Sequence, residues 1–170
     1  MLRKIGVWSV LSAVMLAVMA GCSPVAQDAQ PNTVELSCDI RATYRDLVLA
    51  GTLERHSVGT LELSFTEPET LDGLTAVWDG EDVTLEMYGL SFTADPETVP
   101  ESAFGEEVIA VLDAVLSEDS YREFSGDNTL TLTGETRSGS YTLVYDGATG
   151  YPLSLTMPEL PLSVEFIYND

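Results

Sequence analysis

Histidine, cysteine and basic residues are scarce in this chain of 170 residues, which contains one histidine, two cysteines and seven lysines and arginines. A metal site built on imidazoles needs more than one histidine, and a Ser-His-Asp arrangement would depend entirely on His56. Phosphate-binding glycine loops, nucleophile elbows and the regular spacing of a calcium loop are missing as well. We therefore expect no catalytic residues, no enzymatic activity, no metal and no dissociable cofactor.

The charge of the chain is strongly one-sided, with 28 aspartates and glutamates and a formal net charge of −21. No basic stripe is present that could neutralise phosphates, so nucleic acid is excluded as a partner. The same charge disfavours lying flat on an anionic lipid surface. We therefore expect an acidic domain that stands away from any membrane that holds it.

The first residues resemble an export signal. Arg3 and Lys4 precede an apolar stretch at 5–20, which is shorter than the roughly 20 residues that cross a bilayer as a helix. A positive start, a short apolar middle and an exit of small residues are typical of a cleaved signal peptide. We therefore expect residues 1–21 to be a signal peptide rather than a permanent membrane anchor.

The end of this segment, Met19-Ala20-Gly21-Cys22, resembles a bacterial lipobox. The resemblance implies cleavage before Cys22, a diacylglyceryl thioether on its sulfur and usually an acyl chain, such as palmitate, on the new amine. Two or more acyl chains, at about 0.8 kcal/mol per buried methylene, hold a protein on a membrane almost permanently. The alternative is an ordinary secretory signal in which Cys22 is incidental. We expect lipidation at Cys22 and a lipid-anchored position on the extracytoplasmic face of the cell membrane.

The rest of the chain divides into a spacer and one domain. Residues 22–33 contain two prolines and no periodic pattern, which predicts a flexible spacer after the lipidated cysteine. Residues 34–170 are then a single domain of ordinary size. Cys38 follows an alternating apolar pattern in that domain, so we expect a buried structural side chain rather than the alternative of a reactive thiol.

Alternation of apolar and polar residues predicts strands over most of the domain. The predicted strands are 34–43, 46–55, 59–66, 74–79, 83–92, 128–135, 139–146, 151–157 and 161–168. Short turns between them, such as Asp79-Gly80 and Asp146-Gly147, predict an antiparallel meander. One face of the meander is apolar, and its candidate ligand-binding residues are Leu61, Leu63, Phe65, Leu143, Leu153, Leu155, Met157, Leu162, Val164 and Phe166.

Residues 103–117 predict the one strong helix, with Ser102 as N-cap. At about 100° per residue its apolar side chains gather on one side. These are Phe104, Val108, Ile109, Val111, Leu112, Val115 and Leu116. We expect the helix to be a lid on the apolar face of the sheet, turned toward it through Phe104, Val108, Leu112 and Val115. The pattern leaves open whether the helix fills the space beneath it or caps a cavity.

Two segments resemble known lipoproteins. Residues 50–92, through Pro68 and Asp79-Gly80, are similar to the lipoprotein carrier and receptor family with the LolA/LolB-like fold. Residues 141–168 resemble the closing meander of small lipoproteins from spore-forming bacteria, including a germination lipoprotein. The resemblance implies a mainly β (α+β) fold, in which a strongly bent antiparallel sheet forms a half-open barrel and helices cover its concave face. No ligand contact is carried over, because the turn at Ser57-Val58-Gly59 differs from that of the carriers.

Two functions follow from this interpretation. In the preferred interpretation, the protein is a membrane-anchored, non-enzymatic module that binds an acyl chain or another apolar ligand. The resemblance implies this ligand, because the concave face of that family accepts acyl chains. In the alternative, a protein-interaction or scaffold lipoprotein binds an exported partner, such as a cell-wall enzyme, through an exposed edge or its acidic surface. A cavity of about 300 Å³ or more fits a ligand, whereas interdigitated side chains fit a scaffold.

Overall fold

The structure is a computed structural model that describes residues 31–95, 98, 103–116, 121–125 and 128–169. The strands of this part are β1 (Leu36–Tyr44), β2 (Leu47–Arg55), β3 (Leu61–Glu67), β4 (Thr75–Trp78), β5 (Val83–Met87), β6 (Leu90–Ala94), β7 (Tyr121–Ser125), β8 (Thr129–Thr136), β9 (Gly139–Asp146), β10 (Pro152–Met157) and β11 (Leu162–Ile167). The helix α2 (Ala103–Ala114) lies between β6 and β7 in the chain.

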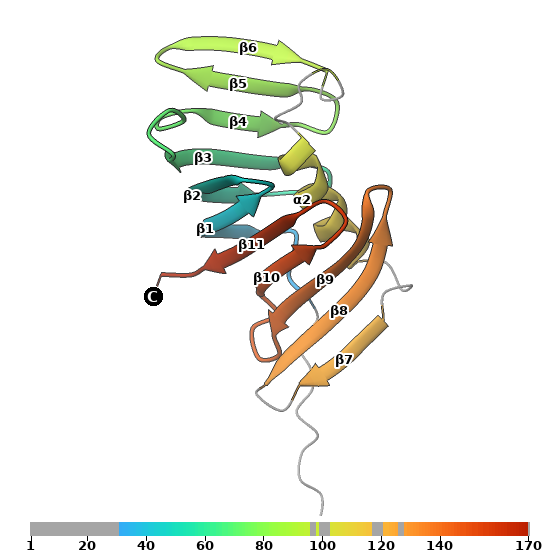
Figure 1. Ribbon diagram of the computed structural model, residues 1–170. Helices are drawn as coiled ribbons and strands as arrows, with labels where there is room; N and C mark the ends of the chain where they lie inside the picture. The colour runs from blue at the N-terminus through green and yellow to red at the C-terminus, as the bar shows by residue number, and fades with distance from the viewer. Residues whose placement is uncertain (1–30, 96–97, 99–102, 117–120, 126–127, 170) are drawn as a thin grey trace, which may run out of the picture.

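All eleven strands belong to one antiparallel sheet in the order β6-β5-β4-β3-β2-β1-β11-β10-β9-β8-β7. Strands β1 to β6 form one meander and β7 to β11 a second, and β1 joins the two by pairing with β11, where Ile40 lies opposite Phe166. The sheet bends strongly and α2 lies on the inner side of the bend (Figure 1). No pairing between β6 and β7 closes the sheet within the described residues. The expected mainly β fold, with one open antiparallel sheet and a single helix, is therefore confirmed in the described part of the chain.

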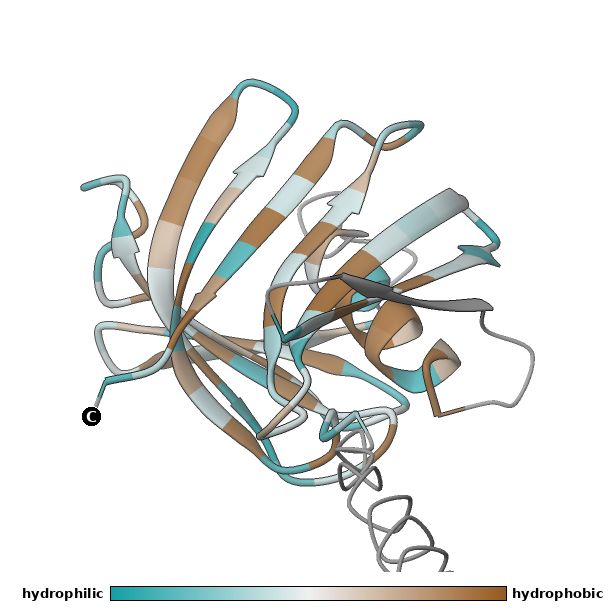
Figure 2. Cartoon of the chain, turned by 90° about the horizontal axis from the view of Figure 1, so that it is seen from below, coloured by the Kyte–Doolittle hydropathy of each residue, from teal (hydrophilic) through white to brown (hydrophobic). Residues whose placement is uncertain are grey.

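The burial of the strands follows the alternation in the sequence. In β1 and β11 every second residue is buried and the residues between are mostly exposed. Figure 2 shows the same alternation of apolar and polar residues along several strands that curve around α2. A period of two places successive side chains on opposite faces of a strand, so one face of the sheet is apolar and the other is in contact with water.

Eight of the nine predicted strands are confirmed to within about two residues, but the strand predicted at 83–92 is wrong. This segment is the hairpin of β5 and β6, with Met87 opposite Leu90. Tyr88 and Gly89 form the turn with φ angles of 52° and 79°, and positive φ at both central residues is typical of a type I′ turn. The turn carries no sequence signal at its first central position, because tyrosine is not one of the residues that normally mark it. Strand β7 is a further difference, since no strand was predicted at Tyr121–Ser125.

The predicted helix is confirmed over Ala103–Ala114 and continues as a turn to Leu116. Leu116 is 43% exposed and does not belong to the buried side of the helix as we predicted. Ser102 lies outside the described residues. None of the helices in the described part of the chain combines the length and the apolar content needed to cross a bilayer.

The N-terminal boundary of the folded domain differs from the predicted one. Thr33, which we assigned to the flexible spacer, is buried, and the Asn32 N–H donates a hydrogen bond of 2.8 Å to the Gly150 carbonyl. The domain therefore begins at least two residues before position 34. The predicted signal peptide and Cys22 lie outside the described residues.

Candidate functional site

The candidate site is the apolar concave face of the sheet together with the side of α2 that covers it. Nine of the ten predicted ligand-binding residues are buried there. They are Leu61, Leu63, Phe65, Leu143, Leu155, Met157, Leu162, Val164 and Phe166, each no more than 9% exposed. They come from β3, β9, β10 and β11, so the bend of the sheet brings both meanders around one core. Their contact with a ligand stays a prediction.

Leu153 is the exception, because it is only half-buried. The register between β9 and β10 shifts between Pro152 and Ser154, so that Pro152 lies opposite Tyr145 and Ser154 opposite Val144. This β-bulge leaves Leu153 without a direct partner and interrupts the alternation. The buried position that we predicted for Leu153 is held by Pro152 instead.

The ten candidate residues make up only part of the concave face. Further buried residues are Leu36, Ile40, Leu49, Leu53, Ala76, Trp78, Val83, Leu130, Leu132, Tyr141 and Tyr145. Most of them, including Ala76 and Trp78 of β4, lie on the same alternating pattern as the predicted residues. The Trp78 ring packs directly beneath Gly105 of α2. A Cβ atom added to Gly105 would lie 2.3 Å from Cζ2 of Trp78, so the glycine allows the helix to approach the indole.

The helix fills the hollow that it covers. The four predicted lid residues, Phe104, Val108, Leu112 and Val115, are each at most 2% exposed and belong to the same core cluster as the sheet residues. Four surface pockets of about 270 to 500 Å³ occur on the described part of the molecule, and none of these four is lined by a predicted ligand-binding or lid residue. By the criterion given above, this interdigitated packing favours the scaffold alternative, and the hollow has room for a ligand only when α2 moves away.

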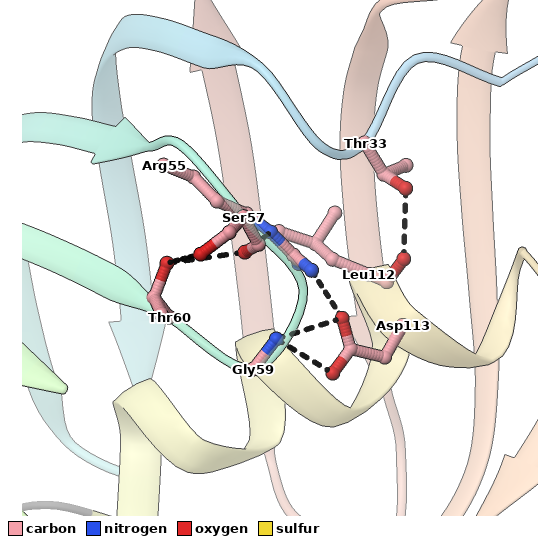
Figure 3. Close-up of polar contacts among 7 residues, drawn as sticks. All are labelled: Thr33, Arg55, Ser57, Gly59, Thr60, Leu112 and Asp113. Carbon is pink, nitrogen blue, oxygen red and sulfur yellow. Dashed lines mark hydrogen bonds and ion pairs between the residues drawn. The ribbon is translucent and has the colours of Figure 1, made fainter. Parts of the chain in front are cut away.

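A polar cluster fastens the C-terminal end of α2 to the turn between β2 and β3 (Figure 3). The guanidinium of Arg55 forms an ion pair with the carboxylate of Asp113 in the last turn of the helix. The Arg55 Nε donates a hydrogen bond of 3.2 Å to the Ser57 carbonyl. The Gly59 N–H approaches both Asp113 oxygens, at 3.4 and 3.2 Å. One carboxylate thus binds both the buried arginine and the backbone of the turn.

Burial makes this ion pair important for the position of the helix. The Arg55 side chain is 0% exposed, whereas that of Asp113 is 29% exposed. A buried charge that loses its partner typically costs about 3–5 kcal/mol. The helix therefore leaves this position only if Arg55 finds another partner or water.

Two further contacts hold the helix on its other sides. Thr33 Oγ1 donates a hydrogen bond of 2.8 Å to the Leu112 carbonyl, one of the terminal carbonyls that has no partner within a helix. Near the start of α2, Glu107 accepts hydrogen bonds from Ser138 Oγ and from Thr136 Oγ1, the latter at 3.5 Å. The segment before β1 and the turn between β8 and β9 therefore both touch the helix.

The other two residues considered as reactive groups, His56 and Cys38, lie in surroundings that give them no catalytic role. His56 is exposed between β2 and β3, with Nε2 3.7 Å from a Glu54 oxygen. Cys38 is 5% exposed, and burial raises the pKa of its thiol to about 11. At neutral pH the thiol is therefore protonated, which supports the structural interpretation. No group of three or more histidine, cysteine or acidic side chains that could hold a metal occurs among the residues the structure describes.

These observations define a mainly β protein with an open, strongly bent antiparallel sheet and one helix packed into its concave face. No family model and no curated protein sequence matches the chain. Among solved structures, it is similar to an uncharacterized conserved protein from Thermus thermophilus, with a TM-score of 0.50, 11% identity, and coverage of 77% of this chain and 74% of that one. It also matches a LolA superfamily protein from Nitrosomonas europaea, with a TM-score of 0.40, 14% identity, and coverage of 85% and 89%. The first likeness shows a shared fold and nothing about function, and the second is too weak to carry an argument.

Proposed function

We propose that the protein is a membrane-anchored extracytoplasmic lipoprotein whose half-barrel binds an acyl chain or another apolar ligand and catalyses no reaction. The observation that carries the proposal is the continuous apolar surface inside an open sheet, covered by a single helix. The resemblance of residues 50–92 to lipoprotein carriers and receptors supports the same function. An apolar concave surface covered by a helix suits a ligand of the same chemistry as the helix side chains, provided that the helix can move away.

The ligand would take the place of the helix side chains. Burial of one valine, leucine or phenylalanine side chain contributes roughly 1.5–3 kcal/mol, and an acyl chain that enters the hollow buries apolar surface of the same kind. The ligand would therefore regain part of the apolar burial that is lost when the helix leaves. The Arg55–Asp113 ion pair then decides how readily the closed arrangement opens, since it is lost when the helix leaves.

The anchor would hold this module close to a source of acyl chains. Removal of residues 1–21 takes away Arg3 and Lys4, so the mature chain has 7 − 2 = 5 basic residues against 28 acidic ones, a formal charge of −23. Such a charge keeps the domain away from anionic head groups, while the lipid on Cys22 keeps it near the membrane.

A titration with an environment-sensitive fluorescent fatty acid tests the proposed binding. The full chain should bind the probe, and Asp113→Ala should bind it at least about tenfold more tightly, because the closed arrangement is destabilised. Glu165→Ala is the matched control, since it removes an exposed carboxylate on β11 without touching α2. Failure of both the full chain and Asp113→Ala to bind the fatty acid would contradict the proposal.

A further inference from the structure

We propose that strand β6 is a docking site for an extended, cationic segment of an exported protein, which would add a further strand to this edge of the sheet. Strand β6 ends the sheet in Figure 1 and pairs only with β5 among the described residues. Leu90, Ser91, Phe92 and Thr93 are all exposed, with 77% of Leu90 and 61% of Phe92 open to solvent. No other strand with described side chains is as open.

The unpaired backbone groups of β6 determine what kind of partner fits. Met87 and Leu90 flank a two-residue turn, so the residues that exchange hydrogen bonds with β5 are Leu90 and, two positions on, Phe92. The N–H and C=O groups of Ser91 and Thr93 therefore point away from the sheet. A row of backbone donors and acceptors in the plane of a sheet is complementary to another extended chain.

The inner face of β6 continues the concave face beyond the reach of the helix. The register places Phe92 opposite Leu85, Leu85 opposite Ala76 and Ala76 opposite Leu63. Along this row the exposed fraction rises from 1% at Leu63 to 61% at Phe92. A strand added to β6 would therefore place an apolar side chain beside Phe92 on the inner face.

The two edges of the sheet differ in their protection. Edge strands of natural proteins are commonly guarded by charged residues, prolines or bulges. The sequence of β6, LSFTA, contains neither a charged residue nor a proline, and its pairing with β5 has no register shift. By contrast, β7 at the opposite edge contains Arg122 and Glu123. The sequence therefore leaves only β6 open to an additional strand.

The negative charge of the chain favours a positively charged partner. The chain has a formal charge of −21, and the exposed Glu86 lies opposite Ser91 on the outer face, where Thr84 Oγ1 and Thr93 Oγ1 are 3.0 Å apart. A segment with apolar residues at alternate positions and lysine or arginine between them satisfies both faces. A second copy of this chain has the same negative charge and is disfavoured as the occupant.

Binding of synthetic peptides to the full chain tests the inference. The probe is a fluorescein-labelled peptide of alternating Lys and Val or Phe residues, and the comparisons are the same peptide with Glu for Lys and one with alternate backbone nitrogens methylated. Ser91→Pro removes one outward N–H at a position where proline is tolerated, and Ser91→Ala is its matched control. We expect Ser91→Pro, Phe92→Ala and N-methylation each to weaken binding of the cationic peptide about tenfold, with Ser91→Ala unchanged.

Several outcomes would overturn the inference. Equal binding by Ser91→Pro and Ser91→Ala, or by the N-methylated and unmodified peptides, would show that the peptide binds the acidic surface at large. Tighter binding of the acidic peptide would contradict the charge argument. A dimer of the unmodified chain that Ser91→Pro abolishes would make a second copy the occupant. Fatty-acid binding should be the same in Ser91→Pro as in the unmodified chain, so failure of this inference and failure of the proposed function are distinguishable.

Discussion

Asp113 in the last turn of α2 forms an ion pair with the buried Arg55 at the end of β2, although 58 positions separate them in the sequence. The pair joins the helix to the rim of the half-barrel at the end where the N-terminal segment also touches the helix through Thr33. The lid is thus fixed by an electrostatic contact at one end and by apolar packing along its length.

Loss of Asp113 should destabilise the closed fold. Asp113→Ala leaves Arg55 without its ionic partner, and because Asp113 is partly exposed we expect the lower end of the usual range, about 3 kcal/mol. Urea unfolding measures this change in the free energy of unfolding. Glu165→Ala should change it by less than about 0.5 kcal/mol. A double variant, Arg55→Met with Asp113→Leu, should recover much of the loss because no unpaired charge remains, and a cost below about 1 kcal/mol for Asp113→Ala would contradict the account.

A side chain at position 105 should push the helix away from the sheet. Gly105→Ala places a Cβ 2.3 Å from the Trp78 ring, and overpacking of this kind typically costs about 1–3 kcal/mol. In a domain of this size, 1 kcal/mol corresponds to roughly 2–4 °C in Tm. Thermal unfolding followed by circular dichroism should show that drop, and Trp78→Leu in the same chain should reverse part of it by making room. Without the close approach to the indole, alanine should raise the Tm, because it favours a helix over glycine by up to about 1 kcal/mol. A raised Tm for Gly105→Ala would therefore contradict the described contact.

The buried thiol of Cys38 should make the fold sensitive to alkaline pH. Burial raises the pKa of Cys38 to about 11, whereas an unfolded cysteine has a pKa of about 8.5. Between these values the folded state binds more protons than the unfolded state, so stability is fully present below about pH 8.5 and decreases as the pH rises toward 11. Cys38→Ala should show a smaller decrease over that range in urea unfolding. Equal slopes for the two proteins would contradict the buried, protonated thiol.

The turn between β9 and β10 should be sensitive to acid. Asp146 accepts hydrogen bonds of 2.8 Å from the Thr149 N–H and 2.7 Å from the Ala148 N–H, and these backbone donors lower the pKa of its carboxyl. Because the Asp146 pKa is lower in the folded state, its hydrogen bonds stabilise the fold at any pH above the pKa of an unfolded aspartate. This stabilisation is lost as the pH falls through the pKa of Asp146 in the folded state. An NMR titration should give Asp146 a midpoint below that of an unfolded aspartate. A midpoint at or above the unfolded value would rule out these hydrogen bonds in solution.

Lipidation should depend on Cys22 alone. In cells given radiolabelled palmitate, the unmodified chain should incorporate label and fractionate with membranes, whereas Cys22→Ser should do neither. Cys38→Ser is the matched control and should behave as the unmodified chain, since Cys38 is buried in the domain. Absence of label from the unmodified chain would contradict the proposed lipid anchor.

Much of the sheet could be predicted from the sequence because burial on one face imposes a period of two. That period correctly placed Leu61, Leu63, Val164 and Phe166 in the core. It failed at Leu153, because a bulge inserts one residue without changing the composition of the strand. Alternation shows which face of a strand is apolar, but it contains no information on where an extra residue interrupts the pairing.

The parts of the candidate site that depend on distant residues could not be predicted. Arg55 falls on the buried side of the alternation in β2 and Asp113 on the polar side of the helix, and neither pattern shows that the two side chains meet. The same is true of the filling of the hollow, which depends on the depth to which α2 enters and therefore on the contact between Gly105 and Trp78. Hairpin β5–β6 was missed for a local reason, since Tyr88 adopts a positive φ that glycine or asparagine normally supplies.

Native mass spectrometry of the full chain, extracted from membranes in mild detergent, tests the central claim most directly. The account predicts a species heavier than the covalently lipidated chain by the mass of one non-covalent acyl lipid, and a larger share of that species in Asp113→Ala than in Glu165→Ala. A single species at the mass of the covalently lipidated chain, unchanged in Asp113→Ala, would contradict the claim that the concave face takes up an apolar ligand in place of α2.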